Sequence, residues 1–348
     1  MLQSAPVDFQ GFPHTVGKST RHGSDDPGKH GLRCRWAPKL RELIRKGAAH
    51  GALRLLRRHR YAWERRKYKP LDFRHSMFTE QVPRGSGMED IFGYIAYGDN
   101  ELYHRGALLS ALKLLHYCPK ARIIVATDRP ALFKAYPVDT MPISAEEKDQ
   151  MSFGWRYHFG IKAGALIELL KQADRLIFMD SDHYPVRDLS RGFEDISPTH
   201  SIMRQREKPH AWTPRLAGKD VRIGDYAVTG LEPMWQSGIL GVHRDNLPAL
   251  LAAYPPMLAV HEIAKIDAAE QFCIGVALTQ DGRTLSAHHL PIGDYNTRGK
   301  KLFAAPRVRQ FFSAHGAEPI AQQIAKAARY RLWRTPVDLW HQRHMWSF

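Results

Sequence analysis

The chain has 348 residues, 43% hydrophobic and 25% charged, which is ordinary for a globular protein with a buried core. Its three cysteines are far apart, which excludes a disulfide framework and a CxxC metal site, and no apolar leader is evident, so we expect a cytoplasmic protein. The net charge of +16 is uneven, since residues 1–86 carry 19 Lys and Arg against 7 Asp and Glu, and residues 321–348 carry 5 against 1. Residues 87–320 are therefore close to neutral, and we expect the functional domain there.

Two segments precede that domain. Residues 1–30 are rich in Gly, Ser, His and Asp without periodicity, which is typical of a disordered tail. Residues 31–86 include "PKLRELIRKGAAHGALRLLRRHRY", which places leucines and alanines on one helical face and basic residues on the other. This basic extension could be a solvated helix, a helix at an anionic membrane surface, or a nucleic-acid-binding segment. The aromatic residues among the cations favour the membrane surface over nucleic acid.

The domain itself predicts strands that alternate with helices. Short apolar runs at 91–99 ("IFGYIAYGD"), 121–128 ("ARIIVATD") and 175–182 ("RLIFMDSD") have the composition of buried strands. Between them, 102–117 and roughly 159–173 have helical spacing. This alternation predicts an α/β, Rossmann-like fold with a mostly parallel sheet covered by helices on both faces.

Polar residues stand where these strands end. Gly98, Asp128, Asp180 and Asp182 all fall at carboxyl ends, which is where parallel sheets bind ligands. Two carboxylates that converge beside a buried sheet repel each other unless a cation lies between them. A hard divalent ion, Mn²⁺ or Mg²⁺, shared with substrate phosphates is the usual solution. The alternative is a pair of loop aspartates, one capping a turn and one in solvent.

Seven segments between about residue 91 and residue 316 resemble, in order, the motifs of glycosyltransferase family eight, which has the GT-A fold. The DxD segment "RLIFMDSDHYPVRDLS" carries the resemblance best. The others are "GYIAYGDNELYHRGALLSALKLL", "WRYHFGIKAGALIELL", "MWQSGILGVHRDNL", "AAEQFCIGVAL", "LPIGDYN" and "FFSAHGAEP". The resemblance implies transfer of a sugar from a nucleotide-diphosphate donor, a UDP-sugar above all, to a saccharide or glycolipid, with Mn²⁺ (or Mg²⁺) and with retention of configuration.

The resemblance also implies a set of site residues. The donor would be bound by Ala96, Tyr97, Gly98, Lys162, Asp180 and Ser181, the metal by Asp180, Asp182 and His315, and the catalytic positions would be Gln271, Glu270 and Gln236. The sequence departs from the family where Gln236 replaces Asn and Glu270 replaces Asp. "SAHGAEP" also lacks the usual His-x-x-Gly spacing, so His288 and His289 compete with His315 as the third metal ligand.

Residues 321–348 alternate tryptophans with arginines, which suits the headgroup region of a membrane. The expectation is therefore a cytoplasmic enzyme held peripherally at the inner, anionic membrane surface, with nucleic acid an unlikely partner. Two other functions stay open. A DxD phosphohydrolase would need Thr or Val where His183 stands, and a basic nucleic-acid-binding protein would use the α/β domain only as a scaffold.

Overall fold

The computed structural model describes residues 89–332. The chain divides into two units, Met1–Met77 and Phe78–Phe348, and the described residues all belong to the second. The tail expected at 1–30 and the basic extension expected at 31–86 lie outside the described residues. So do the aromatic and basic residues from 333 onward.

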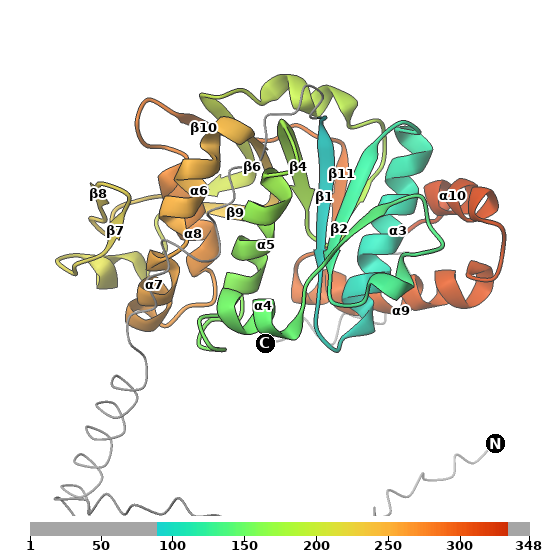
Figure 1. Ribbon diagram of the computed structural model, residues 1–348, viewed down its shortest axis with the longest axis horizontal. Coiled ribbons are helices and arrows are strands. Elements are labelled where there is room, and N and C mark those ends of the chain that lie inside the picture. The colour runs from blue at the N-terminus through green and yellow to red at the C-terminus, as the bar shows by residue number, and fades with distance from the viewer. Residues whose placement is uncertain (1–88, 333–348) are drawn as a thin grey trace, which may run out of the picture. The chain divides into compact units, whose positions relative to one another are not determined.

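A seven-stranded sheet forms the centre of the described unit, in the order β10-β6-β9-β4-β1-β2-β3 (Figure 1). Its strands are β1 (Ile91–Ala96), β2 (Arg122–Thr127), β3 (Asp139–Pro142), β4 (Arg175–Met179), β6 (His200–Glu207), β9 (Met234–His243) and β10 (Thr284–Ala287). Neighbouring strands are parallel except at β9, which runs antiparallel to both β4 and β6. The predicted α/β fold with a mostly parallel, Rossmann-like sheet is confirmed.

Helices and two small sheets surround this centre. The helices are α3 (Glu101–Tyr117), α4 (Ala145–Met151), α5 (Gly160–Leu170), α6 (Leu247–Ala253), α7 (Pro256–Ala264), α8 (Ala269–Ala277), α9 (Arg298–His315) and α10 (Ile320–Arg329). The small sheets pair β5 (His183–Pro185) with β11 (Ile292–Asp294), and β7 (Arg222–Ile223) with β8 (Tyr226–Ala227). Both pairs are antiparallel.

The five elements predicted from the sequence are β1, α3, β2, α5 and β4, in that order. The start of α3 has a local cause, because the Asn100 side chain accepts a hydrogen bond from the Leu102 N–H and so caps the first turn. The helix ends at Tyr117, with Cys118 as its cap, just before a proline that cannot continue it.

Successive residues of β1 face the two sides of the sheet. The Tyr94 hydroxyl hydrogen-bonds to Ser110 of α3 on one side, at 2.8 Å. On the other side a Cβ added to Gly93 would lie 3.1 Å from the Leu169 side chain of α5. Figure 1 accordingly shows α3 and α5 on opposite faces of the sheet, so that both faces are covered.

The core extends into the expected C-terminal segment, 321–348. Ala327 of α10 and Leu332 are buried in the same hydrophobic core as β1 and α3. The Lys113 ammonium, from α3, donates to the main-chain oxygen of Tyr330 at 3.0 Å. The described part of this segment is therefore packed on α3 rather than separate from it.

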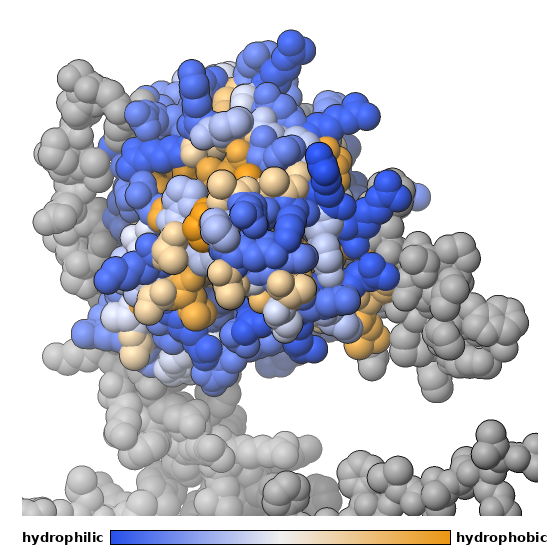
Figure 2. Space-filling view, turned by 90° about the vertical axis from the view of Figure 1, so that its right-hand side faces the viewer, coloured by the Kyte–Doolittle hydropathy of each residue, from blue (hydrophilic) through white to orange (hydrophobic). Residues whose placement is uncertain are grey.

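The surface of the described unit mixes polar and apolar side chains. Figure 2 looks onto the side at the right of Figure 1, where hydrophilic residues predominate and hydrophobic ones appear in small groups. Among residues 89–332 no single helix is long and apolar enough to cross a membrane. The segments Arg244–Ala253 and Pro256–Ala264 reach that length only together, with a bend of 46° between them. Residues from both, such as Leu250 and Val260, are buried in the core.

Candidate metal centre

The loop after β4 carries four chemically active residues in a row, from Asp180 to His183. The main chain fixes this loop at three points. The Asp180 N–H donates to the Gly238 carbonyl of β9 at 2.8 Å, and the His183 N–H donates to the Asp180 carbonyl at 3.0 Å. The Asp182 carbonyl accepts from the Tyr295 N–H, also at 3.0 Å. Its side chains therefore project from a well-defined backbone.

A buried chain of hydrogen bonds ties the same loop to α3. The Ser110 hydroxyl donates to the His183 carbonyl at 2.6 Å and also bonds to the Tyr94 hydroxyl. One turn earlier in α3, a Cβ added to Gly106 would lie 2.4 Å from the Ser181 carbonyl. Only glycine allows the helix to approach the loop so closely. Ser181 thus contributes its backbone to the packing of the site.

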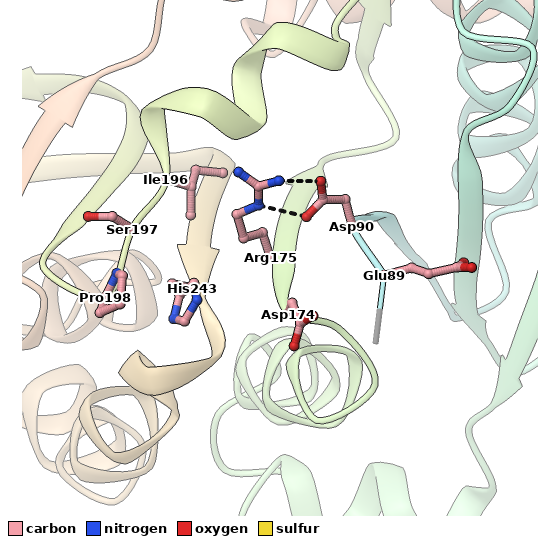
Figure 3. Close-up of a pocket in the computed structure, with 8 residues that line it drawn as sticks. All are labelled: Glu89, Asp90, Asp174, Arg175, Ile196, Ser197, Pro198 and His243. Atoms are coloured by element: carbon pink, nitrogen blue, oxygen red, sulfur yellow. Dashed lines mark hydrogen bonds and ion pairs between the residues drawn. The ribbon is translucent and has the colours of Figure 1, made fainter. Parts of the chain in front are cut away.

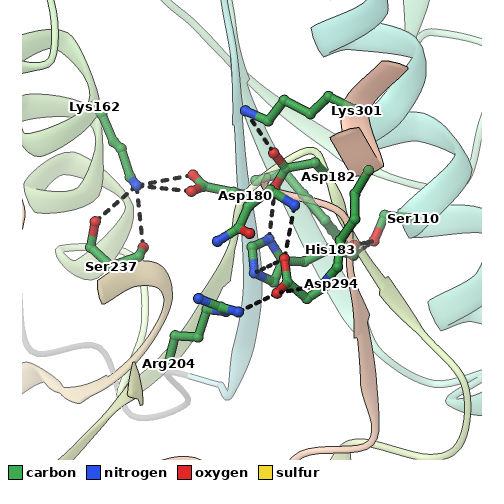
Figure 4. A network of polar contacts seen from close by, with 12 residues as sticks. Ser110, Lys162, Asp180, Asp182, His183, Arg204, Ser237, Asp294 and Lys301 are labelled. Atoms are coloured by element: carbon green, nitrogen blue, oxygen red, sulfur yellow. Dashed lines mark hydrogen bonds and ion pairs between the residues drawn. The ribbon is translucent and has the colours of Figure 1, made fainter. Parts of the chain in front are cut away.

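Asp180, Asp182 and His183 form a group that could hold a metal ion (Figure 4). Their ligand atoms all lie within 4.8 Å of one another. The His183 ring is fully buried, its Nδ1 lies 2.9 Å from Asp182 Oδ1, and its Nε2 has no hydrogen-bond partner among the described residues. An orphaned buried nitrogen beside two carboxylates fits a cation. The imidazole favours a transition metal such as Mn²⁺ over Mg²⁺, which prefers oxygen ligands alone.

His315, predicted as the third ligand, is not in this group, and that prediction is not met. It ends α9, where its Nδ1 lies 3.1 Å from Glu318 Oε1. Helix α9 reaches the carboxylate pair with Lys301 in its first turns, and 14 further residues of helix place His315 about 20 Å away along the axis. The competing His288 lies nearer, and burial, with His183 and Arg204 close by, lowers its pKa to about 4.

Lys162 connects Asp180 to Glu270. Its ammonium group lies 3.0 Å from Asp180 Oδ1 and 3.3 Å from Glu270 Oε1, and it also donates to the hydroxyl and carbonyl oxygens of Ser237. Burial alone would lower the pKa of Lys162, but the two carboxylates outweigh it and raise the pKa above its ordinary value. Lys162 is therefore a buried, charged residue. Figure 4 shows it on the left of the network.

A second carboxylate–cation group lies on the other side of His183. Strand β11 pairs Asp294 with His183, so that Asp294 Oδ1 lies 3.8 Å from His183 Nε2. Arg204 of β6 forms an ion pair with Asp294, and Lys300 lies 3.4 Å from it. Lys301 lies 3.0 Å from Asp182 Oδ2. Burial alone would raise the pKa of Asp182, but the hydrogen bond from His183 and the charge of Lys301 lower it well below its usual range.

The three predicted catalytic residues lie at different distances from this network. Glu270 belongs to it, because its carboxylate accepts from the Ser237 hydroxyl at 2.5 Å as well as pairing with Lys162. Gln271 is adjacent, since its Oε1 accepts from the Ser237 N–H at 3.4 Å. Gln236 instead donates to Glu207 of β6, and its Oε1 is buried without a partner among the described residues. The structure therefore brings Glu270 into the network of Lys162 and Gln271 next to its Ser237, but directs Gln236 elsewhere.

The predicted donor residues Ala96, Tyr97 and Gly98 follow one another at the end of β1. Ala96 is buried, and the Tyr97 ring lies 5.1 Å from the His158 ring. Burial, and then the nearby carboxylates of Glu270 and Asp180, raise the pKa of Tyr97. The phenol therefore stays neutral and lies beside the network built around Lys162.

Asp128, at the end of β2, holds the turn that follows β1. It accepts from the Gly98 N–H at 2.9 Å, and its oxygens lie 3.0 Å from His104 Nε2 and 2.6 Å from Lys148 Nζ. Gly98 has a φ of +90°, which favours glycine. Although burial would raise the pKa of Asp128, Lys148, Gly98 and His104 lower it.

This lowered pKa gives a pH-dependent stability. The native carboxylate binds a proton less readily than the unfolded one, whose pKa is about 4, so its contribution is complete at pH 7 and is lost as the pH falls through the native pKa. Urea unfolding should show that Asp128→Asn costs about 2 kcal/mol at pH 7 and clearly less at pH 3. The exposed Asp139, paired with Arg122, is the control, and its Asn variant should cost about 0–1 kcal/mol. Equal losses at both pH values would contradict the assignment.

Gly238 leaves room for the ring of His183. A Cβ at this position would lie 2.6 Å from His183 Cε1 and 3.4 Å from Asp180 Oδ2. Gly238→Ala should therefore lower Mn²⁺ affinity about 10-fold or more, because the ring must move, and destabilise the fold by about 1–3 kcal/mol. Gly293→Ala is the matched control, since its Cβ would meet nothing closer than 3.5 Å. Isothermal titration with Mn²⁺ checks this, and equal affinities in the two variants would refute it.

A hollow lies at the opposite edge of the sheet. This pocket of about 560 Å³ lies at the beginnings of β1 and β4, the end of antiparallel β9 and the segment before β6. It is lined by Glu89, Asp90, Asp174, Arg175, Ile196, Ser197, Pro198 and His243 (Figure 3). Arg175 is held there by two hydrogen bonds to the Asp90 carboxylate, at 2.7 and 2.6 Å. Parallel sheets bind ligands at the carboxyl edge, so we place the site at Asp180 and not here.

Sequence reasoning missed several members of the network. His183 directly follows the DxD motif, and Asp294 lies within "LPIGDYN", so a signal for both was present. Ser237 lies within "MWQSGILGVHRDNL" and so carried one too, whereas Arg204 and Lys301 carried none. The chain matches no protein-family model, and no curated protein matches it. The case for a function therefore rests on the residues and geometry described above.

Proposed function

We propose that the protein is a metal-dependent glycosyltransferase that transfers a sugar from a nucleotide-diphosphate donor, a UDP-sugar above all, to a saccharide or glycolipid. One observation carries the proposal. Asp180, Asp182 and His183 stand at the carboxyl edge of a mostly parallel sheet, directly beside the Lys162–Glu270 pair. That edge is where sheets of this kind bind nucleotides, and the donor set suits a divalent metal.

In this proposal Asp180, Asp182 and His183 hold Mn²⁺. The metal would supply Lewis-acid stabilisation of the negative charge that collects on the diphosphate leaving group. Lys162 keeps Asp180 in place, since its ammonium group is fixed by Ser237 and Glu270 as well. Because the pKa of Lys162 is raised, this positive charge persists through neutral pH.

The nucleoside would lie at the end of β1. Tyr97 offers an aromatic face for stacking on the base, and Gly98 lets the backbone approach the ligand because no Cβ stands there. A Cβ atom added to Gly98 would have no neighbouring atom within 4 Å, so the space beside this residue is open. Asp128 holds this turn through the Gly98 N–H.

Glu270 and Gln271 are the proposed residues on the sugar side. Glu270 is buried and its carboxylate is already bound by Lys162 and Ser237, so we assign it to positioning. Gln271 has an amide that could stabilise positive charge near the anomeric carbon, in a reaction with retention. We assign no catalytic role to Gln236, because its amide is directed to Glu207.

The test is turnover with a panel of nucleotide sugars, at saturating Mn²⁺ and after removal of metal by a chelator. Release of the nucleoside diphosphate should require metal and should be selective for one donor. The same panel run with phosphate esters separates this function from a DxD phosphohydrolase. Metal-dependent hydrolysis of esters without any turnover of nucleotide sugars would reject the proposal.

A further inference from the structure

The three carboxylates around His183 are each paired with a cation of the protein itself. Asp180 pairs with Lys162, Asp182 with Lys301, and Asp294 with Arg204 and Lys300. With Glu270, the described residues of the network include four carboxylates and four cations. If His183 is left out, the charges of these eight groups cancel. A divalent cation added to this network gives it an excess of positive charge.

Two of these cations differ in how firmly they are held. Lys162 is only 10% exposed and has five oxygen atoms around it, from Asp180, Glu270 and Ser237. Lys301 is 52% exposed, and its ammonium group pairs with Asp182 Oδ2. A half-exposed ion pair contributes less and exchanges more readily than a buried one, whose disruption is costly.

Both oxygens of Asp182 are in use, Oδ1 by His183 and Oδ2 by Lys301. Each oxygen keeps a second lone pair, but a metal ion bound at Asp182 would lie beside the Lys301 ammonium group, and the two positive charges would repel each other. His183 is fully buried and fixed by the hydrogen bond from Ser110 to its carbonyl. Lys301 has a long, half-exposed side chain, so it is the partner that can leave.

We propose that Lys301 is an internal counterion that occupies Asp182 until a divalent metal binds, and that it then moves to the diphosphate of the donor. This rests on the proposed function. Lys301 stands in the opening turns of α9 beside Lys300, behind the Thr297 cap, so its released charge stays at the edge of the site. The diphosphate of a nucleotide sugar brings roughly two negative charges, about what one divalent ion offsets. Metal and diphosphate therefore bind best together, each increasing the affinity of the other.

The test is Lys301→Met, which keeps the length of the side chain and removes its charge. Mn²⁺ binding alone is followed by the electron paramagnetic resonance signal of free Mn²⁺, and binding of methylenediphosphonate, a diphosphate analogue without a base, by calorimetry at saturating Mn²⁺. We expect Mn²⁺ alone to bind about 5-fold tighter and the diphosphonate about 10-fold more weakly than in the wild type. Lys326→Met is the control, because Lys326 is also half-exposed and paired with a carboxylate, Glu318, outside the site. It should change neither affinity.

Opposite changes in the two affinities are the signature of the exchange. Unchanged or weaker Mn²⁺ binding in Lys301→Met would show that Lys301 does not compete for Asp182, and unchanged diphosphonate binding would show that it does not reach the ligand. Either result overturns the inference, even if nucleotide sugars are turned over. The reverse outcome, opposite changes without turnover of any nucleotide sugar, would leave the exchange standing and reject the proposed function.

Discussion

Replacement of Asp182 by Asn should lower metal-dependent turnover by about 10³-fold, equivalent to roughly 4 kcal/mol of transition-state stabilisation. The amide keeps the size of the side chain but has no negative charge. It therefore loses the attraction for a cation, and it weakens the hydrogen bond with His183 and the ion pair with Lys301. Steady-state kinetics at saturating Mn²⁺ measure the effect.

The control for Asp182→Asn is Asp188→Asn. Asp188 also lies on the segment after β4, but its carboxylate accepts from the thiol of Cys118 and the N–H of Ser190, outside the network. Its variant should retain most of the activity. If Asp182→Asn kept wild-type turnover at the same Mn²⁺ concentration, the carboxylate pair could not be the metal site.

Lys162→Met should destabilise the protein by about 3–5 kcal/mol, the largest stability effect we expect. Without its charge, Asp180 and the buried Glu270 are left facing each other without compensation. Urea unfolding at pH 7 measures this. The control is Lys134→Met, because Lys134 is an exposed lysine and its replacement should cost only about 0–0.5 kcal/mol.

A second substitution separates charge from packing. The double variant Lys162→Met, Glu270→Gln lacks the charge of Glu270 as well, so only Asp180 is left without its cation. It should therefore be more stable than Lys162→Met alone. A loss that comes only from altered packing would give no such recovery. Equal destabilisation by Lys162→Met and Lys134→Met would contradict the described role of Lys162.

The sheet and the edge that carries the candidate site could be predicted from sequence because both depend on local signals. Apolar runs in the sequence predicted β1, β2 and β4. These three strands are neighbours and pair in parallel, which brings their carboxyl ends to one edge of the sheet. The hydrogen bond from the Gly98 N–H to Asp128 joins two residues that were expected to meet there. Lys162 was expected among the residues that bind the donor, and it lies beside Asp180, another residue of that set.

The positions of the other network residues depend on long-range pairing, which no local pattern predicts. Ser237 lies beside Asp180 because β9 enters the sheet antiparallel, between β4 and β6. Arg204 lies where the register of β6 with β9 shifts, and such a bulge redirects a side chain. Asp294 reaches His183 through the small β5–β11 sheet. The expectation for His315 failed because motif order says nothing about the length of α9, which separates it from the pair.

The most direct test of the central claim is the position of a bound metal. Crystals of the full chain grown with Mn²⁺ and a nucleoside diphosphate should give one anomalous difference peak at the manganese edge, in contact with Asp180, Asp182 and His183, and with the diphosphate beside it. A peak elsewhere, or diphosphate bound without metal at the Asp180–Asp182 pair, would contradict the account.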